Sequence, residues 1–208
     1  MDILNFFSWI KSGRLVSSVD PAKTLIPFAV KDNKRDDKYL AVTMTAEDFI
    51  NQITPDILYS ATFFDTTTQN NGGATVANQV LINSTQNTDG FTLGPDNRIN
   101  VLNSASYFLS LHLQLAFTGG ASNFNVTVWY TVDDVIVPNS AFTFTTSSQQ
   151  NDQTLATITD TIHLNAGQYI KFYWWAQATG MKLLSTAAGT NPTRPLSPSV
   201  NFTIFNVG

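Results

Sequence analysis

Few side chains in this 208-residue sequence could do acid, base or metal chemistry. There is no cysteine, and neither His112 nor His163 has a histidine or carboxylate at metal-ligand spacing. Glu47 is the only glutamate, so a pair of carboxylates for glycoside hydrolysis would need aspartates. Asp133 and Asp134 are adjacent but separate two apolar runs, which predicts a tight turn. The sequence therefore predicts no enzyme, no catalytic residue, no metal site and no cofactor.

The consecutive aromatic residues Tyr173, Trp174 and Trp175 are the most informative group for function. Successive residues of a strand point to opposite faces, so these three cannot share one face. If Phe172 and Trp174 fill an interior, Tyr169, Tyr173 and Trp175 lie outside it. Large aromatics on an outer face indicate an interface, so we expect these three to join copies of the chain. Carbohydrate stacking and cover by a loop are the alternatives.

Charge density changes at about residue 56. The chain has 11 basic and 15 acidic residues, 26 in all, and residues 1–56 hold 15 of them. The other 152 residues hold 11, and the net charge of −4 includes no clustered basic face. A nucleic-acid partner is therefore not expected. The change predicts an N-terminal arm, residues 1–55, and a β-domain, residues 56–208.

The arm begins with an apolar stripe whose residues recur at three- and four-residue spacing. This spacing predicts a short amphipathic helix that ends near Gly13. So short a helix is marginal alone, and we expect its stripe to dock on another protein. The rest of the chain and a membrane surface are the alternatives, but the stretch is too short to span a bilayer. The proposed anchoring residues are Ile3, Phe6, Phe7, Trp9 and Ile10.

The rest of the arm combines prolines with mixed charges. Residues 15–44 contain Pro21 and Pro27, which predicts an extended, loop-rich segment. Thr45 and Asp48 resemble a capping box and predict a second short helix over residues 46–53. Pro55 would end that helix, because the residue before a proline disfavours helical geometry.

From residue 57 on, apolar and polar residues alternate with the period of a strand. The clearest run covers residues 107–117, with apolar side chains at the odd positions. Further runs cover residues 124–132, 169–175 and 200–207, with weaker ones near 57–64, 79–82, 135–137, 142–144 and 158–164. Residues 185–198 are rich in Ser, Thr and Pro and predict a loop. The predicted fold is mainly β, an antiparallel β-sandwich.

Three stretches of the β-domain resemble the C1q/TNF-like jelly roll. They are INVLNSASYFLSLHLQLAF at residues 99–117, ITDTIHLNAGQYIKFYWW at 158–175 and SVNFTIFNVG at 199–208. Ser106 departs from the family pattern, which usually has glycine before the tyrosine found here as Tyr107. The resemblance implies a jelly roll that forms a homotrimer.

The first quarter of the chain is similar to the opening of structural proteins of tailed phages, especially marine ones. NFFSWIKSGR, KRDDKYL and AEDF carry this likeness. Together the two resemblances imply a bacteriophage head-fibre or capsid-decoration protein, made in the host cytoplasm and displayed on the virion surface. Its N-terminal arm would bind a capsid or other virion protein. A glycan-binding receptor-recognition module, with a host-surface glycan as partner, and a C1q-like ligand-binding protein are the alternatives.

Overall fold

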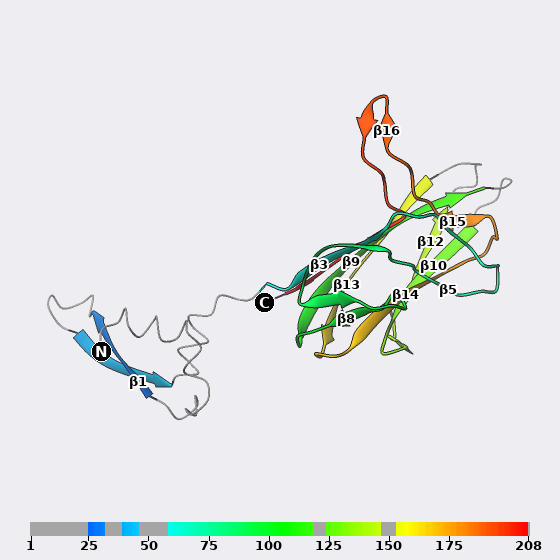
Figure 1. The fold of residues 1–208 in the computed structure, drawn as a ribbon. Helices are drawn as coiled ribbons and strands as arrows, with labels where there is room; N and C mark the ends of the chain where they lie inside the picture. The colour runs from blue at the N-terminus through cyan, green and yellow to red at the C-terminus, as the bar shows by residue number, and fades with distance from the viewer. Residues whose placement is uncertain (1–24, 32–38, 46–57, 119–123, 147–152, 208) are drawn as a thin grey trace. The chain divides into compact units, whose positions relative to one another are not determined.

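The structure, a computed structural model, describes residues 25–31, 39–45, 58–118, 124–146 and 153–207 (Figure 1). The chain divides into two compact units, residues 1–57 and 58–208. Both predicted N-terminal helices, and the anchoring stripe, lie outside the described residues. In the described ranges no helix is long and apolar enough to cross a membrane.

The first unit contains a β-hairpin that the sequence did not predict. Strands β1 (Leu25–Lys31) and β2 (Tyr39–Thr45) pair antiparallel, from Leu25 opposite Thr45 to Lys31 opposite Tyr39. The expectation of a loop-rich segment over residues 15–44 was therefore wrong for these two stretches. Pro27, which suggested a loop, is tolerated because both strands of a two-stranded hairpin are edge strands.

The second unit consists of strands joined by turns and loops. The longest strands coincide with the predicted alternating runs. The six-residue strand Ser84–Asp89 and several strands of two or three residues were not predicted. The predicted run at residues 79–82 was wrong beyond residue 79, because the strand there is only Asn78–Gln79. The strands are β3 (Ser60–Asp65), β4 (Gln69–Asn70), β5 (Asn78–Gln79), β6 (Ser84–Asp89), β7 (Phe91–Leu93), β8 (Ile99–Val101), β9 (Ala105–Phe117), β10 (Phe124–Val132), β11 (Val135–Ile136), β12 (Phe142–Thr146), β13 (Gln153–Leu164), β14 (Tyr169–Ala176), β15 (Met181–Leu183), β16 (Gly189–Thr190), β17 (Thr193–Arg194) and β18 (Val200–Asn206).

Eight of these strands form a jelly roll. One sheet has the order β13-β9-β18-β3, with β6 beyond β3, and the other has the order β12-β10-β14-β8, with β7 beyond β8. The first strand pairs with the last (β3 with β18), the second with the seventh (β8 with β14), the third with the sixth (β9 with β13) and the fourth with the fifth (β10 with β12). This nested antiparallel pairing is that of a rolled-up eight-stranded hairpin, so the predicted jelly-roll sandwich is confirmed.

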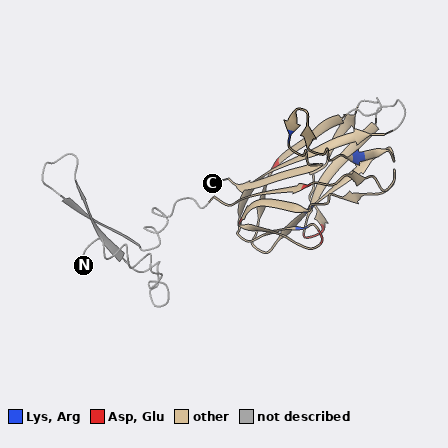
Figure 2. Ribbon diagram, turned by 45° about the horizontal axis from the view of Figure 1, so that its top comes forward, with Lys and Arg blue, Asp and Glu red and all other residues tan. Residues whose placement is uncertain are grey.

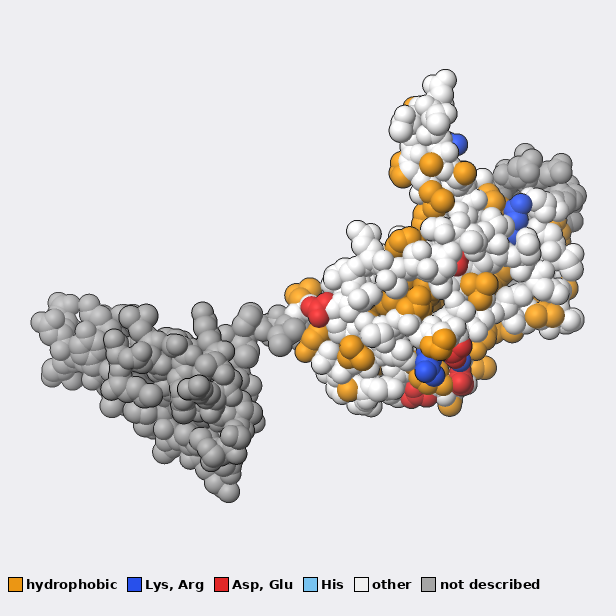
Figure 3. Space-filling view, viewed as in Figure 1, with side chains coloured by type: hydrophobic (Ala, Val, Ile, Leu, Met, Phe, Trp, Pro, Cys, Tyr) orange, Lys and Arg blue, Asp and Glu red, His pale blue; other side chains and the backbone are white. Residues whose placement is uncertain are grey.

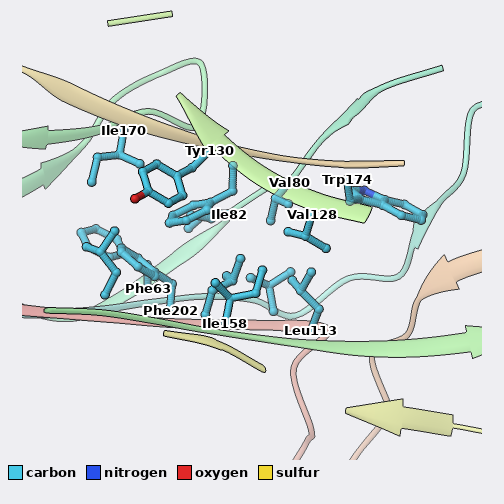
Figure 4. Packing of buried hydrophobic residues seen from close by; sticks show 14 of the residues in the cluster. Phe63, Val80, Ile82, Leu113, Val128, Tyr130, Ile158, Ile170, Trp174 and Phe202 are labelled. Atoms are coloured by element: carbon cyan, nitrogen blue, oxygen red, sulfur yellow. The ribbon is translucent and has the colours of Figure 1, made fainter. Parts of the chain in front are cut away.

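The core lies between the two sheets (Figure 4). On β9 the odd residues from Tyr107 to Leu115 are at most 2% exposed, as the alternation predicted. The ring of Phe202 lies 4.7 Å from that of Phe172 in the facing sheet. Burying one such side chain contributes about 1.5–3 kcal/mol, so the interdigitated core supplies most of the stability. Trp174 is fully buried in this core, also as predicted.

Two turns at one end of the sandwich follow from local sequence. Asp133 and Asp134 connect β10 to β11 with φ angles of 51° and 62°, which confirms the predicted tight turn. Gly167, between β13 and β14, has a φ of 89°, a conformation that glycine adopts without strain. Both turns position the start of β14 and its outward side chains.

Residues 185–198, predicted as a loop, contain the short hairpin β16–β17, which projects from the sandwich (Figure 1). An isolated bridge between Thr186 and Ser197 closes its base. The loop prediction was thus wrong for β16 and β17, because pairs of two residues carry no detectable period.

Candidate functional site

The aromatic face is the exterior of the β12-β10-β14-β8 sheet and carries Trp129, Tyr169, Tyr173 and Trp175. The three β14 residues alternate with buried neighbours, so they point away from the core as predicted. Trp129 lies opposite Tyr173 on β10, and their rings are 6.0 Å apart with an interplanar angle of 15°. The predicted aromatics therefore share one surface, and Trp129 joins them.

Each predicted aromatic residue also has a partner within its own protomer. Trp175 donates a hydrogen bond from Nε1 to the carbonyl oxygen of Ala74, at 2.6 Å. Tyr169 donates from its hydroxyl to Asp134 Oδ2, at 2.7 Å. All of the outward aromatics are half-buried. The prediction that they join copies of the chain is not tested by one protomer and stays a prediction.

A cluster of charges stands at one end of the aromatic face. Lys171 is only 8% exposed, and its Nζ lies 2.9 Å from both Asp96 Oδ2 and Asp134 Oδ1. Arg98 Nε lies 3.4 Å from Asp96, and the Arg98 guanidinium lies 5.3 Å from the centre of the Tyr169 ring. Lys171 thus ties β14 to two separate turns.

The bonds within this cluster shift several pKa values in a consistent direction. The hydrogen bond with Lys171 holds the pKa of Asp96 and of Asp134 below the ordinary aspartate value, whereas the partial desolvation of each opposes that shift. The two carboxylates raise the pKa of Lys171 above its ordinary value, first through the bond with Asp96. The Asp134 carboxylate raises the pKa of the Tyr169 phenol. These shifts favour the charged forms of Asp96, Asp134 and Lys171 and the neutral phenol of Tyr169, which are the forms present at neutral pH.

Charges are scarce over the rest of the described sandwich, as the few blue and red residues in Figures 2 and 3 show. Among the described residues of the second unit, half of the charged side chains are in this one cluster. The cluster holds Asp96, Arg98, Asp133, Asp134 and Lys171, and the others are Asp65, Asp89, Asp160, Lys182 and Arg194.

The neutral face is the exterior of the β13-β9-β18-β3 sheet and carries no Asp, Glu, Lys or Arg. Pairing across the four strands aligns its side chains in rows, with apolar residues at both ends of the sheet. Its residues are Gln153, Leu155, Thr157, Thr159, Thr161, His163, Ser106, Phe108, Ser110, His112, Gln114, Asn201, Thr203, Phe205, Ser60, Thr62 and Phe64. The rings of Phe108 and Phe205 are 5.2 Å apart, and Leu155 is 61% exposed.

The two histidines lie outside the core, as the alternation predicted. His112 is on the neutral face, with Nε2 3.1 Å from Ser110 Oγ and Nδ1 3.0 Å from Thr157 Oγ1. It helps to line a hollow of about 310 Å³ with Gln114, Leu155, Pro198 and Asn201. His163 is exposed near the end of β13. Among the described residues, no three His, Asp or Glu side chains are grouped as metal ligands.

Some of these residues could have been found from the sequence and others could not. Trp129 alternates with the apolar residues of its strand, so its outward position was readable, but its pairing with Tyr173 was not. Asp96 and Arg98 lie in a turn more than 70 residues before Lys171, and no local pattern links them. Their meeting depends on the fold of the whole unit.

The comparisons with known proteins concern the fold alone. No protein-family model and no curated protein matches the chain. Among solved structures, it is similar to Eiger TNF from S. frugiperda, with 10% identity, a TM-score of 0.48, and coverage of 73% of this chain and 93% of that one. Murine APRIL is 11% identical, with a TM-score of 0.41, and coverage of 72% of this chain and 99% of that one.

The strand pairing by itself defines the fold class. The described part of the chain is mainly β, and its second unit is a jelly-roll sandwich of two antiparallel sheets.

Proposed function

We propose that the chain is a non-catalytic structural protein of a virion surface. In this proposal the jelly roll forms a homotrimer through the neutral face, and the N-terminal residues bind a capsid or other virion protein. The observation that carries self-association is a four-stranded exterior without a charged side chain. The virion part rests on the resemblance of the first quarter of the sequence to phage structural proteins.

The neutral face has the composition of a contact between copies. The centre of a protein–protein interface is poor in charge and rich in aromatic side chains. Phe64, Phe108 and Phe205 supply the aromatics, and hydroxyl and amide groups fill the rows between them. Removing such a surface from water requires no ion to be desolvated, so only its hydroxyl and amide groups need hydrogen-bond partners across the contact.

A ring of three copies needs two different surfaces on each protomer, and β13 provides the second one. This 12-residue strand pairs with β9 along one edge, and no described strand pairs with its other edge. Asp160, directed toward the core where it accepts a bond from Tyr130, and His163 are its only titratable residues. Long edge strands are normally blunted by lysine, proline or bulges, and an unblunted edge indicates that something covers it. The β13 edge of one copy packing on the neutral face of the next would close the ring.

The mass of the protein in solution tests this proposal. We expect sedimentation equilibrium to give a trimer of the 22.8 kDa chain. Thr203→Lys places a charge at the centre of the neutral face and should yield monomers, because an unpaired ammonium resists burial. Thr143→Lys, at an exposed position of β12 in the other sheet, is the matched control and should remain trimeric. A monomeric wild type, or a trimeric Thr203→Lys variant, contradicts the proposal.

The same measurement separates the two candidate interfaces. Tyr173→Lys places the same charge on the aromatic face, where the sequence predicted the contact between copies. If Tyr173→Lys dissociates the trimer and Thr203→Lys does not, the aromatic residues are the interface. We expect the opposite result.

The anchoring role of the N-terminal residues has its own test. Deleting residues 1–20 should leave a folded, soluble oligomer that no longer joins virus particles. Particles assembled in the presence of the truncated protein would be purified and probed for it. Normal incorporation would show that the stripe of Ile3, Phe6, Phe7, Trp9 and Ile10 is not the anchor.

A further inference from the structure

We infer that the aromatic face is a binding site for a neutral glycan. The site consists of the rings of Trp129, Tyr173 and Trp175, flanked by uncharged hydrogen-bonding side chains. It lies on the opposite sheet from the neutral face and does not depend on self-association.

The three side chains lie on the same face of two adjacent strands. Tyr173 and Trp175 are two residues apart on β14 and point to the same side, about 6.6 Å apart along the strand. Trp129 lies directly opposite Tyr173 on the neighbouring strand, and Thr127 lies opposite Trp175. The surface is therefore two strands wide and about the length of one or two sugar rings. The axial C–H bonds of a sugar ring can pack against the negative faces of such rings.

The rings are held in place before any ligand arrives. The near-parallel arrangement of Trp129 and Tyr173 restricts both side chains, and the bond from Trp175 to the Ala74 carbonyl fixes the indole. Binding then costs little side-chain entropy, which favours a weakly held ligand such as an oligosaccharide. The inner side chains of β10 and β14 already fill the core, so the three outer rings are not needed for core packing.

Hydroxyl and amide groups border the rings. Thr127 and Thr143 share one hydrogen bond, at 3.0 Å, and a hydroxyl can donate one bond and accept two. Gln79, which lies opposite Tyr173 on β5, donates from Nε2 to the Asp96 carbonyl. Each of these side chains therefore retains hydrogen-bonding capacity toward sugar hydroxyls.

The charges near the site select against an acidic ligand. Lys171 is the charged residue next to Tyr173 on the same face, and Asp96 and Asp134 neutralise its ammonium at 2.9 Å. A sulfate or carboxylate of a ligand would have to take the ammonium of Lys171 from both aspartates and would lie close to their negative charges. A neutral sugar avoids this cost, so the chemistry favours hexose or N-acetylhexosamine chains.

A glycan array carrying neutral, uronic-acid and sulfated oligosaccharides tests the inference on the full-length protein. We expect binding to at least one neutral glycan and none that requires acidic groups. That glycan would then be titrated by isothermal calorimetry against three variants. Trp129→Ala and Tyr173→Ser should each weaken binding about tenfold or more, because each removes one stacking ring. Phe205→Ala, an aromatic deletion on the neutral face, is the matched control and should bind normally.

Each outcome decides the question. Absence of binding to every neutral glycan, or selection of acidic ones alone, overturns the inference. So does full binding by both Trp129→Ala and Tyr173→Ser variants with native circular dichroism. If Trp129→Ala fails to fold, Tyr173→Ser and Trp175→Phe carry the test. A glycan-binding monomer would support this inference while contradicting the trimer, so the two proposals fail separately.

Discussion

The two outer surfaces of the sandwich are built by the same strand alternation and have different chemistry. The neutral face carries Thr, Ser, Asn and Gln with three phenylalanines and no charged side chain. The aromatic face carries tryptophans and tyrosines with hydrogen-bonding ends, beside a cluster of paired charges. Phenylalanine and hydroxyl groups suit a surface that is buried between copies, whereas amphipathic rings suit one that stays wet and meets a polar ligand. This difference is the basis of our proposal that assembly and recognition occupy opposite sheets.

The largest expected effect distinguishes the core, which both faces share, from the outer surface of the neutral face. Phe202 and Phe205 are on one strand, but Phe202 is fully buried and Phe205 points outward. Phe202→Ala should lower the free energy of unfolding by about 3–5 kcal/mol, because it leaves a cavity between the sheets. Phe205→Ala should cost the isolated protomer less than about 1.5 kcal/mol, mostly the ring contact with Phe108. Urea denaturation at low protein concentration measures both.

Equal losses for the two phenylalanines would show that the neutral face is not an exterior surface. In that case the register between β18 and β9 would be wrong, since it alone places Phe205 beside Phe108.

The next largest effect concerns the charge cluster beside the aromatic face, whose contribution to stability should depend on pH. The folded-state pKa values of Asp96 and Asp134 lie below the ordinary value of 3.8, so their bonds to Lys171 contribute stability above that pH. This contribution is lost as the pH falls through the lowered values. Lys171→Met should therefore destabilise the protein at pH 7, and its difference from the wild type should shrink as the pH falls below about 4.

Thermal unfolding at a series of pH values measures this effect. Lys182→Met, which removes a lysine with no described ion pair, is the control and should shift the unfolding temperature little at any pH. A Lys171→Met difference that stays constant down to pH 3 would mean that packing, not charge, holds the cluster.

The smallest expected effect concerns Tyr169. The hydrogen bond to the Asp134 carboxylate is the main cause that raises its phenol pKa above 10.0. Asp134→Asn removes the negative charge, so the pKa of Tyr169 should fall toward that ordinary value. The difference between the phenolate absorbance titrations of variant and wild type reports this one tyrosine. Asp89→Asn should leave the titration unchanged.

Much of the fold could be predicted from local pattern, and the parts that could not have a physical reason. The period-two runs around Tyr107, Val128 and Trp174 gave the long strands and their buried sides. Strands of two or three residues, such as β5 and β15, are too short to show a period and exist because a neighbour pairs with them. The β1–β2 hairpin escaped prediction because proline and mixed charges are equally typical of loops.

The candidate site divides in the same way. The alternation placed Tyr169, Tyr173 and Trp175 outside the core, and the structure agrees. It could not place Trp129 beside Tyr173, and it could not bring Asp96 to Lys171.

The sequence by itself determined which side of each strand faces the core, because side-chain direction follows from the two-residue period of an extended backbone. It also determined that few charges would lie on the sandwich. Only the tertiary structure decided which strands are neighbours, since the pairs β3·β18, β8·β14 and β9·β13 join residues far apart in the chain. Those pairings assemble separate outward residues into one uncharged surface and one aromatic surface. The composition of each surface therefore depends on which strands pair and in which register, and the sequence of one strand does not specify its partners.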